Sequence, residues 1–257
     1  AGRTVADAVI GRQPVGPVVV VAGPGNNGGD GVVAARVLAE RGFAVRLALF
    51  GDLAALKGDA AAAAARWPGP VEAAQPSSVQ GAALIVDALF GAGLTRRVEG
   101  TASALIAAIN AEQAPKIAVD LPSGISGDTG QVMGAAAVRA AETVTFFRRK
   151  PGHLLLPGRL HCGKLTVADI GVKPVVLDEI RPQTWANEPT LWLSAFPRPA
   201  VNGHKYSRGH VVVRSGPMPS TGAAKLAARG ALRIGAGLVT IASPANAIAA
   251  YAAESVA

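Results

Sequence analysis

The stretch GPGNNGGDG (residues 23–31) follows the apolar run PVVVVA (17–22) and precedes VVAARVLAERG (32–42). Four consecutive valines predict a buried strand, and the alanine-rich segment predicts a helix over residues 29–41. The glycines between them permit a sharp turn, so that backbone N–H groups at the helix N-terminus can face a phosphate. The first six letters also fit the dinucleotide-binding pattern G-x-G-x-x-G, which is weak on its own.

The same alternation of strand and helix patterns continues to residue 171. Further strands are expected at 44–50, near Val71, and at 84–90, 117–123, 143–147 and 164–171. Helices are expected at 52–66 and 101–112, with a helical or mixed stretch near 133–141, and TVADAVI (4–10) has the pattern of a helix end. Nearly continuous apolar strands indicate a parallel sheet that is covered on both faces. The sequence therefore predicts an α/β fold with three layers.

The composition changes after residue 171. Residues 172–203 contain five prolines and little periodicity, which is typical of a linker. A strand (204–216), a helix (221–237) and another strand (238–244) then follow. Such a short unit buries too little surface for a core of its own, so the second unit is expected to be incomplete.

The charge and the cysteine content narrow the classes of function. The chain has 25 basic and 17 acidic residues, but the basic ones are scattered apart from the run Arg148-Arg149-Lys150, and aromatic residues make up only 4%. This distribution disfavours nucleic acid and fits small phosphorylated molecules; the basic run could steer their phosphates or form a solvated loop. No apolar stretch reaches membrane-spanning length, and the single Cys162 favours a reducing cytoplasm.

Polar side chains follow two later strands. Asp87 lies late in the predicted strand 84–90, and Asp120 and Ser123 lie at the end of the strand 117–123. Carboxyl ends of parallel strands meet at one sheet edge, so these groups are expected near Asn27. Oxygen ligands from Asn27, Asp87 and Ser123 would suit an alkali or alkaline-earth cation, although Asp87 could instead simply cap its turn.

Three motifs, GPGNNGGDG (23–31), VDALFGAGL (86–94) and VDLPSGISGDTG (119–130), resemble in order and spacing those of the NAD(P)H-hydrate epimerase family. TFFRRKPGHLLLPGR (145–159) resembles the bacterial bifunctional NAD(P)H-hydrate repair enzymes. Residues 204–257 resemble the opening of their ADP-dependent NAD(P)H-hydrate dehydratase domain.

The resemblance implies a Rossmann-like epimerase domain over residues 1–171 with a truncated N-terminal helix, a linker over 172–203, and an incomplete ribokinase-like dehydratase fragment over 204–257. It implies R/S epimerisation of NAD(P)H hydrate at C6, with potassium in the epimerase site. ADP, with Mg²⁺, would serve the dehydratase of the full-length protein but not of this chain. A cytoplasmic homo-oligomer without nucleic-acid or membrane partners is expected.

The family's functional residues fall on positions that also end strands here. The implied acid/base group is Asp120. The implied potassium ligands are Asn27, Asp87 and Ser123. The implied substrate-binding residues are Asp120 together with Asn26, Asn27, Gly28, Gly29, Asp30, Gly91, Ala92, Gly93, Leu94, Thr95, Arg96 and Arg97.

The sequence leaves two other interpretations of the function open. An NAD-dependent dehydrogenase would use the glycine loop and place Asp52 on the adenosine ribose. A nucleotide-binding scaffold without activity would keep the fold and lose the chemistry, which the presence of Asp87, Asp120 and Ser123 argues against.

Overall fold

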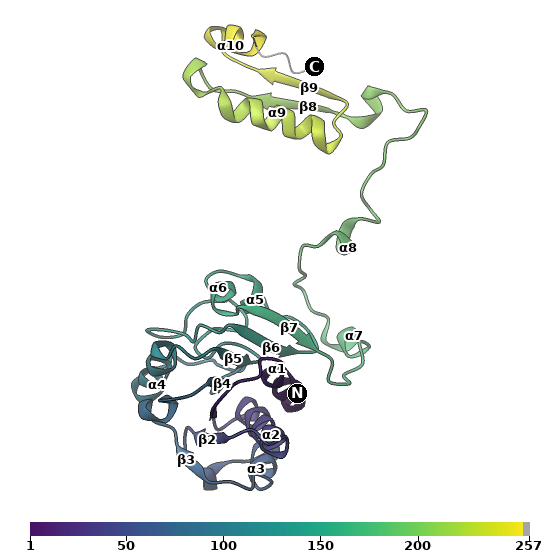
Figure 1. Cartoon of the computed structure of the whole chain (residues 1–257). Coiled ribbons are helices and arrows are strands. Elements are labelled where there is room, and N and C mark those ends of the chain that lie inside the picture. The colour runs from purple at the N-terminus through teal and green to yellow at the C-terminus, as the bar shows by residue number, and fades with distance from the viewer. Residues whose placement is uncertain (254–257) are drawn as a thin grey trace. The chain divides into compact units, whose positions relative to one another are not determined.

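The structure, a computed structural model, describes residues 1–253 and divides into two compact units, with the boundary between Thr184 and Trp185. The first unit contains a seven-stranded, fully parallel sheet in the order β3-β2-β1-β4-β5-β6-β7 (Figure 1). Its strands are β1 (Val18–Ala22), β2 (Val45–Leu49), β3 (Val71–Ala73), β4 (Leu84–Ala88), β5 (Lys116–Val119), β6 (Glu142–Phe146) and β7 (Lys164–Ala168). Since β1 lies between β2 and β4, the chain reverses its direction of strand addition there.

Helices cover both faces of this sheet, which confirms the expected three-layer, Rossmann-like α/β fold. The helices of the first unit are α1 (Gly2–Ile10), α2 (Asn26–Glu40), α3 (Gly58–Ala64), α4 (Gly100–Ala111), α5 (Pro151–Leu154), α6 (Gly158–His161) and α7 (Val176–Ile180). Short 3-10 turns lie at Leu53–Ala55 and Pro76–Val79.

Strand β1 is buried on both faces and shows how the layers are held together. Val18 and Val20 pack in a core with Val32 of α2, whereas Val19 and Val21 belong to the core on the other face, which contains residues of α4. Successive side chains of a strand point to opposite faces, so the valine run supplies both cores.

Several local expectations were wrong, including the strand expected from residue 204, which begins at His210 after a 3-10 turn. The helix expected from residue 29 already begins at Asn26, which brings both asparagines into its first turn. The helix expected over 52–66 is interrupted, because Asp52 accepts a hydrogen bond from the Ala54 N–H and caps a separate 3-10 turn. The strand expected over 117–123 ends at Val119.

Residues 133–141 form no helix. The side chain of Asn110 in α4 donates to the Ala137 carbonyl and accepts from the Arg139 N–H, at 2.9 Å each. These side-chain bonds satisfy backbone groups that a helix would pair internally, so the segment lies extended and irregular against α4.

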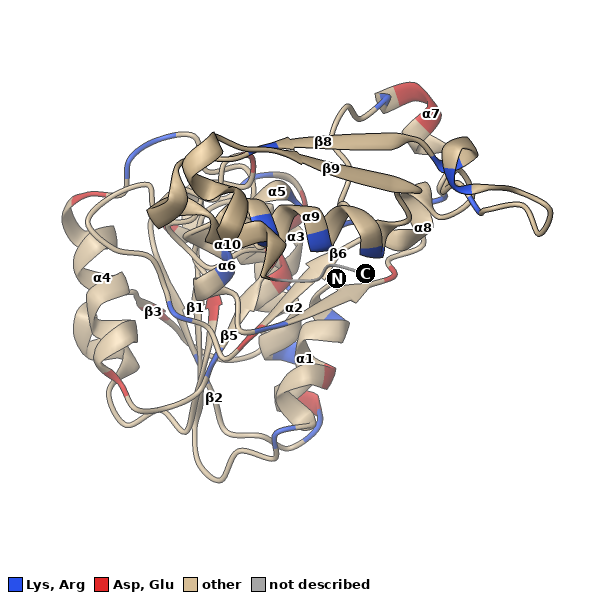
Figure 2. Cartoon of the chain, turned by 90° about the horizontal axis from the view of Figure 1, so that it is seen from above, with Lys and Arg blue, Asp and Glu red and all other residues tan. Residues whose placement is uncertain are grey.

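The second unit contains the parallel pair β8 (His210–Arg214) and β9 (Leu238–Ala242) joined by α9 (Gly222–Ile234). Helices α8 (Pro189–Trp192) and α10 (Ile248–Ala252) and 3-10 turns at Lys205–Arg208, Met218–Ser220 and Ala245–Ala247 complete its described part. Basic positions recur along α9 (Figure 2). The small sheet fits the incomplete α/β segment expected after the linker.

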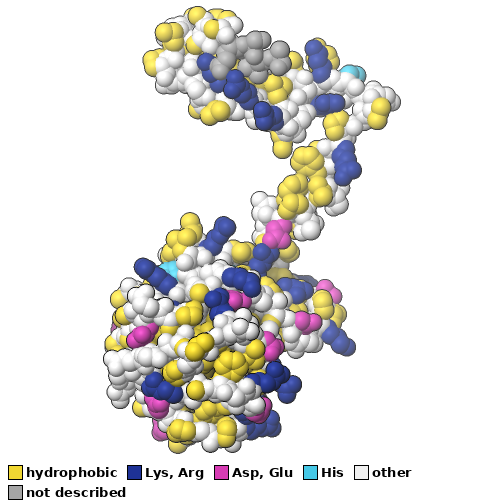
Figure 3. Space-filling model, in the orientation of Figure 1, with side chains coloured by type: hydrophobic (Ala, Val, Ile, Leu, Met, Phe, Trp, Pro, Cys, Tyr) yellow, Lys and Arg dark blue, Asp and Glu magenta, His cyan; other side chains and the backbone are white. Residues whose placement is uncertain are grey.

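The surface matches the scattered charge of the sequence. Lysine and arginine side chains are spread over the visible face of the first unit and are interspersed with acidic ones (Figure 3). Within residues 1–253, no helix combines the length and the apolar character that crossing a membrane requires.

Candidate active site

The glycine loop after β1 packs tightly against the end of β4. A Cβ on Gly28 would lie 1.8 Å from the Gly23 carbonyl oxygen, and a Cβ on Gly23 would lie 1.9 Å from the Leu89 carbonyl oxygen. Side chains at either position would therefore push the loops apart. Gly25 is the N-cap of α2, so the first N–H groups of this helix have no partner within it and remain available to an anion.

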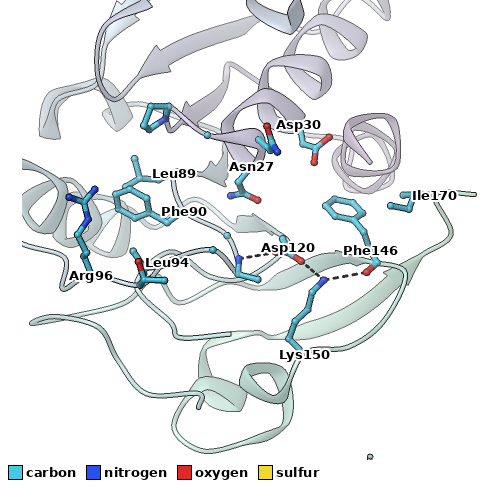
Figure 4. Close-up of a pocket in the computed structure, with 17 residues that line it drawn as sticks. Asn27, Asp30, Leu89, Phe90, Leu94, Arg96, Asp120, Phe146, Lys150 and Ile170 are labelled. Atoms are coloured by element: carbon cyan, nitrogen blue, oxygen red, sulfur yellow. Dashed lines mark hydrogen bonds and ion pairs between the residues drawn. The ribbon is translucent and has the colours of Figure 1, made fainter. Parts of the chain in front are cut away.

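A cavity of about 700 Å³ opens at the carboxyl ends of the strands, beside β1 and β4 (Figure 4). Ligands of open α/β sheets bind at such points of reversal. Its lining comes from the loops after β1, β4, β5, β6 and β7, from the first residues of α2 and from the end of β6. The lining residues are Pro24, Gly25, Asn26, Asn27, Asp30, Leu89, Phe90, Gly91, Ala92, Gly93, Leu94, Thr95, Arg96, Asp120, Phe146, Lys150 and Ile170.

Asp120 follows β5 directly and has a left-handed backbone, with φ at 65°. This region costs a non-glycine residue free energy, although aspartate tolerates it better than most. The conformation ends the strand and directs the carboxylate into the cavity (Figure 4). There Oδ2 accepts a hydrogen bond from the Ala92 N–H at 3.0 Å, and Oδ1 accepts one from the Thr145 hydroxyl at 2.9 Å.

Lys150 pairs with this carboxylate. Its Nζ lies 2.6 Å from Asp120 Oδ1, and it also donates to the Thr145 hydroxyl oxygen at 2.9 Å and to the Phe146 carbonyl at 3.2 Å. Burial by itself would raise the pKa of Asp120. The charge and the hydrogen bond of Lys150, with those from Ala92 and Thr145, outweigh burial and lower this pKa below the usual value. Asp120 is therefore a carboxylate at neutral pH, held beside a proton donor.

Asp87 and Ser123 form a second polar cluster below the surface. Both side chains are fully buried. Asp87 Oδ1 accepts from the Ser123 hydroxyl at 2.5 Å, and its Oδ2 accepts from the Ser123 N–H at 2.8 Å. The Ser123 oxygen in turn accepts from the Phe90 N–H at 2.8 Å. Burial raises the pKa of Asp87 to about 6 in spite of these bonds, because its partners are neutral.

Asn27 reaches the cavity from the first turn of α2. A Cβ on Gly91 would lie 2.8 Å from Asn27 Oδ1 and 3.2 Å from Asp120 Oδ2. Because glycine has no Cβ, both side chains can lie close to the backbone of the loop after β4. Among the buried side-chain nitrogen and oxygen atoms of residues 1–253, Asn27 Nδ2 lacks a hydrogen-bond partner. Unpaired buried polar atoms are costly, which makes this amide a candidate contact for a ligand.

The structure brings most of the predicted site residues together, but not all of them. Those that line the cavity are Asn26, Asn27, Asp30, Gly91, Ala92, Gly93, Leu94, Thr95, Arg96 and Asp120. Gly28 and Gly29 are buried in α2, and Arg97 is exposed outside the lining beside Glu99, at 3.6 Å. Asp87 and Ser123 contact each other, whereas no hydrogen bond within the described chain joins Asn27 to either.

Several lining residues were not expected from the sequence. Apolar surface of the cavity comes from Phe90, Phe146 and Ile170, and a positively charged ammonium group comes from Lys150. Lys150 appeared in the sequence as one member of a basic run. The signal that separates it from its two neighbours is Pro151, because a residue before proline is restricted to extended backbone, as Lys150 is here.

Similarity to known proteins covers most of the chain. Residues 1–152 match the family described as YjeF-related protein N-terminus. The chain belongs to this family. It is 46% identical over 157 residues to an NAD(P)H-hydrate epimerase of Levilactobacillus brevis, which covers 60% of this chain and 73% of that protein.

Longer relatives match both units. The chain is 39% identical over 251 residues to the bifunctional NAD(P)H-hydrate repair enzyme Nnr of Coxiella burnetii, which covers 95% of this chain and 50% of that protein. It is 37% identical to the Moorella thermoacetica protein of the same name, covering 88% of this chain and 45% of that one. The chain thus spans about half the length of these bifunctional relatives.

The crystal structure of the yeast protein ynu0 has the same fold. The two structures superpose with a TM-score of 0.57 at 22% identity, covering 73% of this chain and 84% of the yeast chain. At this identity the likeness speaks for the fold alone.

Proposed function

We propose that the first unit interconverts the R and S epimers of NAD(P)H hydrate at C6 of the nicotinamide ring. The observation that carries the proposal is the Asp120–Lys150 pair, which faces a cavity of about 700 Å³ at the sheet's point of reversal. Membership of the family, and the names of the relatives that match residues in both units, support the choice of substrate.

The reaction requires proton transfer at a defined place. C6 of the hydrated ring bears a hydroxyl group and is bonded to the ring nitrogen, so inversion proceeds by departure and return of the hydroxyl or by transient ring opening. Either route needs a proton delivered to one heteroatom and removed again. Asp120 serves as the acid/base group: Lys150 keeps it ionised, so the carboxylate accepts a proton, and the Lys150 ammonium group, 2.6 Å from Asp120 Oδ1, donates one.

The remaining lining residues bind the substrate. The free N–H groups at the start of α2, at Asn26 and Asn27, suit a phosphate of the dinucleotide. Asp30 and the loop from Gly91 to Arg96 border the same cavity, with Arg96 as a positive group on its wall. Gly28 and Gly29 act through their backbone and their small size. Arg97 would contact substrate only if its loop moves.

Potassium is the proposed cation, with Asp87, Ser123 and Asn27 as ligands. The donors fit a hard monovalent ion, since the ligating atoms would be the oxygens of a carboxylate, a hydroxyl and an amide whose Oδ1 faces Gly91. A bound cation would offset the negative charge of the buried Asp87. Within residues 1–253, no three His, Cys, Asp or Glu side chains cluster to hold a metal.

The full-length protein is proposed to be bifunctional. Its second half would dehydrate the S epimer with ADP and Mg²⁺, and residues 204–257 would form the start of that domain. A cytoplasmic location and assembly as a homo-oligomer also belong to the proposal, and light scattering of the purified chain measures the second of these.

The direct test supplies the R epimer of NADH hydrate to the full chain and follows formation of the S epimer, in potassium chloride and in choline chloride at equal ionic strength. Conversion faster than the spontaneous rate is expected, with a higher rate in potassium. A rate equal to that of buffer alone would refute the epimerase proposal. Adding ADP and following the absorbance of NADH tests the dehydration separately.

A further inference from the structure

A buried histidine connects the backbones of the two residues in the candidate acid/base pair. His153 lies in α5, and only 2% of this residue is exposed. Its Nδ1 accepts a hydrogen bond from the Lys150 N–H at 2.9 Å. Its Nε2 lies 2.7 Å from the carbonyl oxygen of Asp120.

These two partners fix the protonation of the ring. Nδ1 faces an N–H donor, so it must be an unprotonated acceptor, and Nε2 faces a carbonyl oxygen, so it must carry the proton. The geometry therefore selects the neutral Nε2–H tautomer. Burial lowers the pKa of His153, and the charges of Lys150 and Arg149 lower it further, against the opposing effect of Asp120.

The contact to Asp120 falls where the backbone is strained. The Asp120 N–H donates to the Val144 carbonyl of β6 at 2.8 Å, and His153 holds the Asp120 carbonyl on the other side of the same residue. A left-handed φ of 65° persists at an aspartate only when its surroundings hold it in place. His153 thus supplies one of two hydrogen bonds that fix the Asp120 backbone.

The helix that carries His153 has little freedom to move. The Gly152 N–H donates to the Gly127 carbonyl at 2.7 Å, and a Cβ on Gly152 would lie 2.4 Å from the Ser126 carbonyl oxygen. Close packing of α5 on the loop after Asp120 keeps the imidazole at a constant position. Rigid support of this kind is what a group engaged in proton transfer requires.

We propose that His153, as the neutral Nε2–H tautomer, is a positioning residue that holds the Asp120 carboxylate and the Lys150 ammonium in register for proton transfer. The proposal rests on the epimerase function proposed above. His153 does not face the cavity and exchanges no proton with substrate; its effect passes through the Asp120 carbonyl and the Lys150 N–H.

Two substitutions separate the two hydrogen bonds. In His153→Gln the amide N–H can replace Nε2–H and keep the bond to Asp120, whereas in His153→Asn the amide oxygen can replace Nδ1 and keep only the bond to Lys150. We expect His153→Asn to lower kcat on the order of 10²-fold with little change in KM, because displacement of a positioned group by about 1 Å has effects of this size. His153→Gln should recover most of that loss. His204→Asn is the control, since His204 Nδ1 caps Ser207 N–H in the second unit.

A measurement without substrate keeps the proposal independent of the enzyme assay. Carbon-detected NMR of the Asp120 carboxyl should show a pKa that rises in His153→Asn and stays low in His153→Gln, because the carboxylate moves away from Lys150 only in the former. Nitrogen NMR of the wild-type chain should show His153 as the Nε2–H tautomer, which tests the proposal even if a variant fails to fold.

The outcomes separate the two proposals. If the wild-type chain does not epimerise but both NMR results are as expected, the epimerase function is refuted and the positioning role of His153 is supported. An unchanged Asp120 pKa and kcat in His153→Asn, or a different tautomer, would overturn the positioning role.

Discussion

Lys150 Nζ lies 2.6 Å from Asp120 Oδ1, at the edge of a cavity that the loops after β1 and β4 also line. The pair combines a carboxylate that is ionised at neutral pH with an ammonium group that can donate. An ion pair between two partly buried side chains, 28% exposed for Lys150 and 15% for Asp120, contributes little reliable stability, because desolvation of both charges opposes their attraction. Its position in the cavity therefore points to chemistry rather than to folding.

Replacing Asp120 by Asn should abolish most of the epimerase activity and leave the fold intact. Asparagine tolerates the left-handed φ of this position, so the substitution adds no backbone strain, which alanine would. Loss of a positioned acid/base group lowers kcat by about 10²–10⁴-fold. Steady-state kinetics with the R epimer, together with circular dichroism melts, measure both effects. A variant with the wild-type kcat would remove Asp120 from the mechanism.

Replacing Lys150 by Met should raise the pKa of Asp120. The ammonium charge and hydrogen bond are the main causes that lower this pKa, so the pKa rises once they are removed and burial, the largest single cause, is opposed only by the hydrogen bonds from Ala92 and Thr145. Carbon-detected NMR titration of the Asp120 carboxyl measures the change. Lys164→Met is the matched control. Lys164 is the first residue of β7, so it lies at the amino ends of the strands, away from the cavity, and its Nζ lies 3.6 Å from Glu142 Oε1. An Asp120 pKa that does not respond to Lys150→Met would mean that the pair is not formed in solution.

The sequence predicted the sheet and the polar strand ends, because both follow from local patterns. Apolar runs identify buried parallel strands, and parallel strands must end at a common edge, so Asp120 and the glycine loop were expected to be close. Family membership and the three-layer fold are confirmed. The role of each site residue stays a prediction.

The role of Lys150 could not be predicted, because it depends on a turn. Phe147 has a left-handed backbone, with φ at 62°, and the chain reverses there so that Lys150 points toward Asp120. The sequence shows three adjacent basic residues and, through Pro151, an extended backbone at Lys150, but it does not show the turn at Phe147. The sequence left a helical or a mixed course open for residues 133–141 for a similar reason, since the observed irregular course depends on the distant Asn110.

Replacing Gly91 by Ala should disrupt the site without unfolding the chain. The new Cβ would meet Asn27 Oδ1 at 2.8 Å and Asp120 Oδ2 at 3.2 Å, so at least one of these groups must move. We expect kcat to fall on the order of 10²-fold. Gly93→Ala in the same loop should have a much smaller effect, since its Cβ would meet nothing within 4 Å. Equal losses in the two variants would show that contacts to Asn27 and Asp120 are not the cause.

Potassium should stabilise the folded chain more at pH 7.5 than at pH 5, because Asp87 has a raised pKa. A carboxyl group whose folded pKa is raised favours folding when protonated, so without a cation the chain loses stability as pH rises from the usual aspartate range to about 6. The difference corresponds to roughly 3 kcal/mol at most. A cation that binds the carboxylate competes with the proton and restores part of this loss above pH 6.

Circular dichroism melts in potassium chloride and in choline chloride at equal ionic strength measure this effect. An increase in Tm of several degrees is expected in potassium at pH 7.5, at about 2–4 °C for each kcal/mol. The increase should shrink at pH 5, where Asp87 is protonated, and should vanish in Asp87→Asn at both pH values. If choline gives the same Tm as potassium, or if Asp87→Asn keeps the potassium response, Asp87 is not a cation ligand, and its bonds to Ser123 serve only to hold the two loops together.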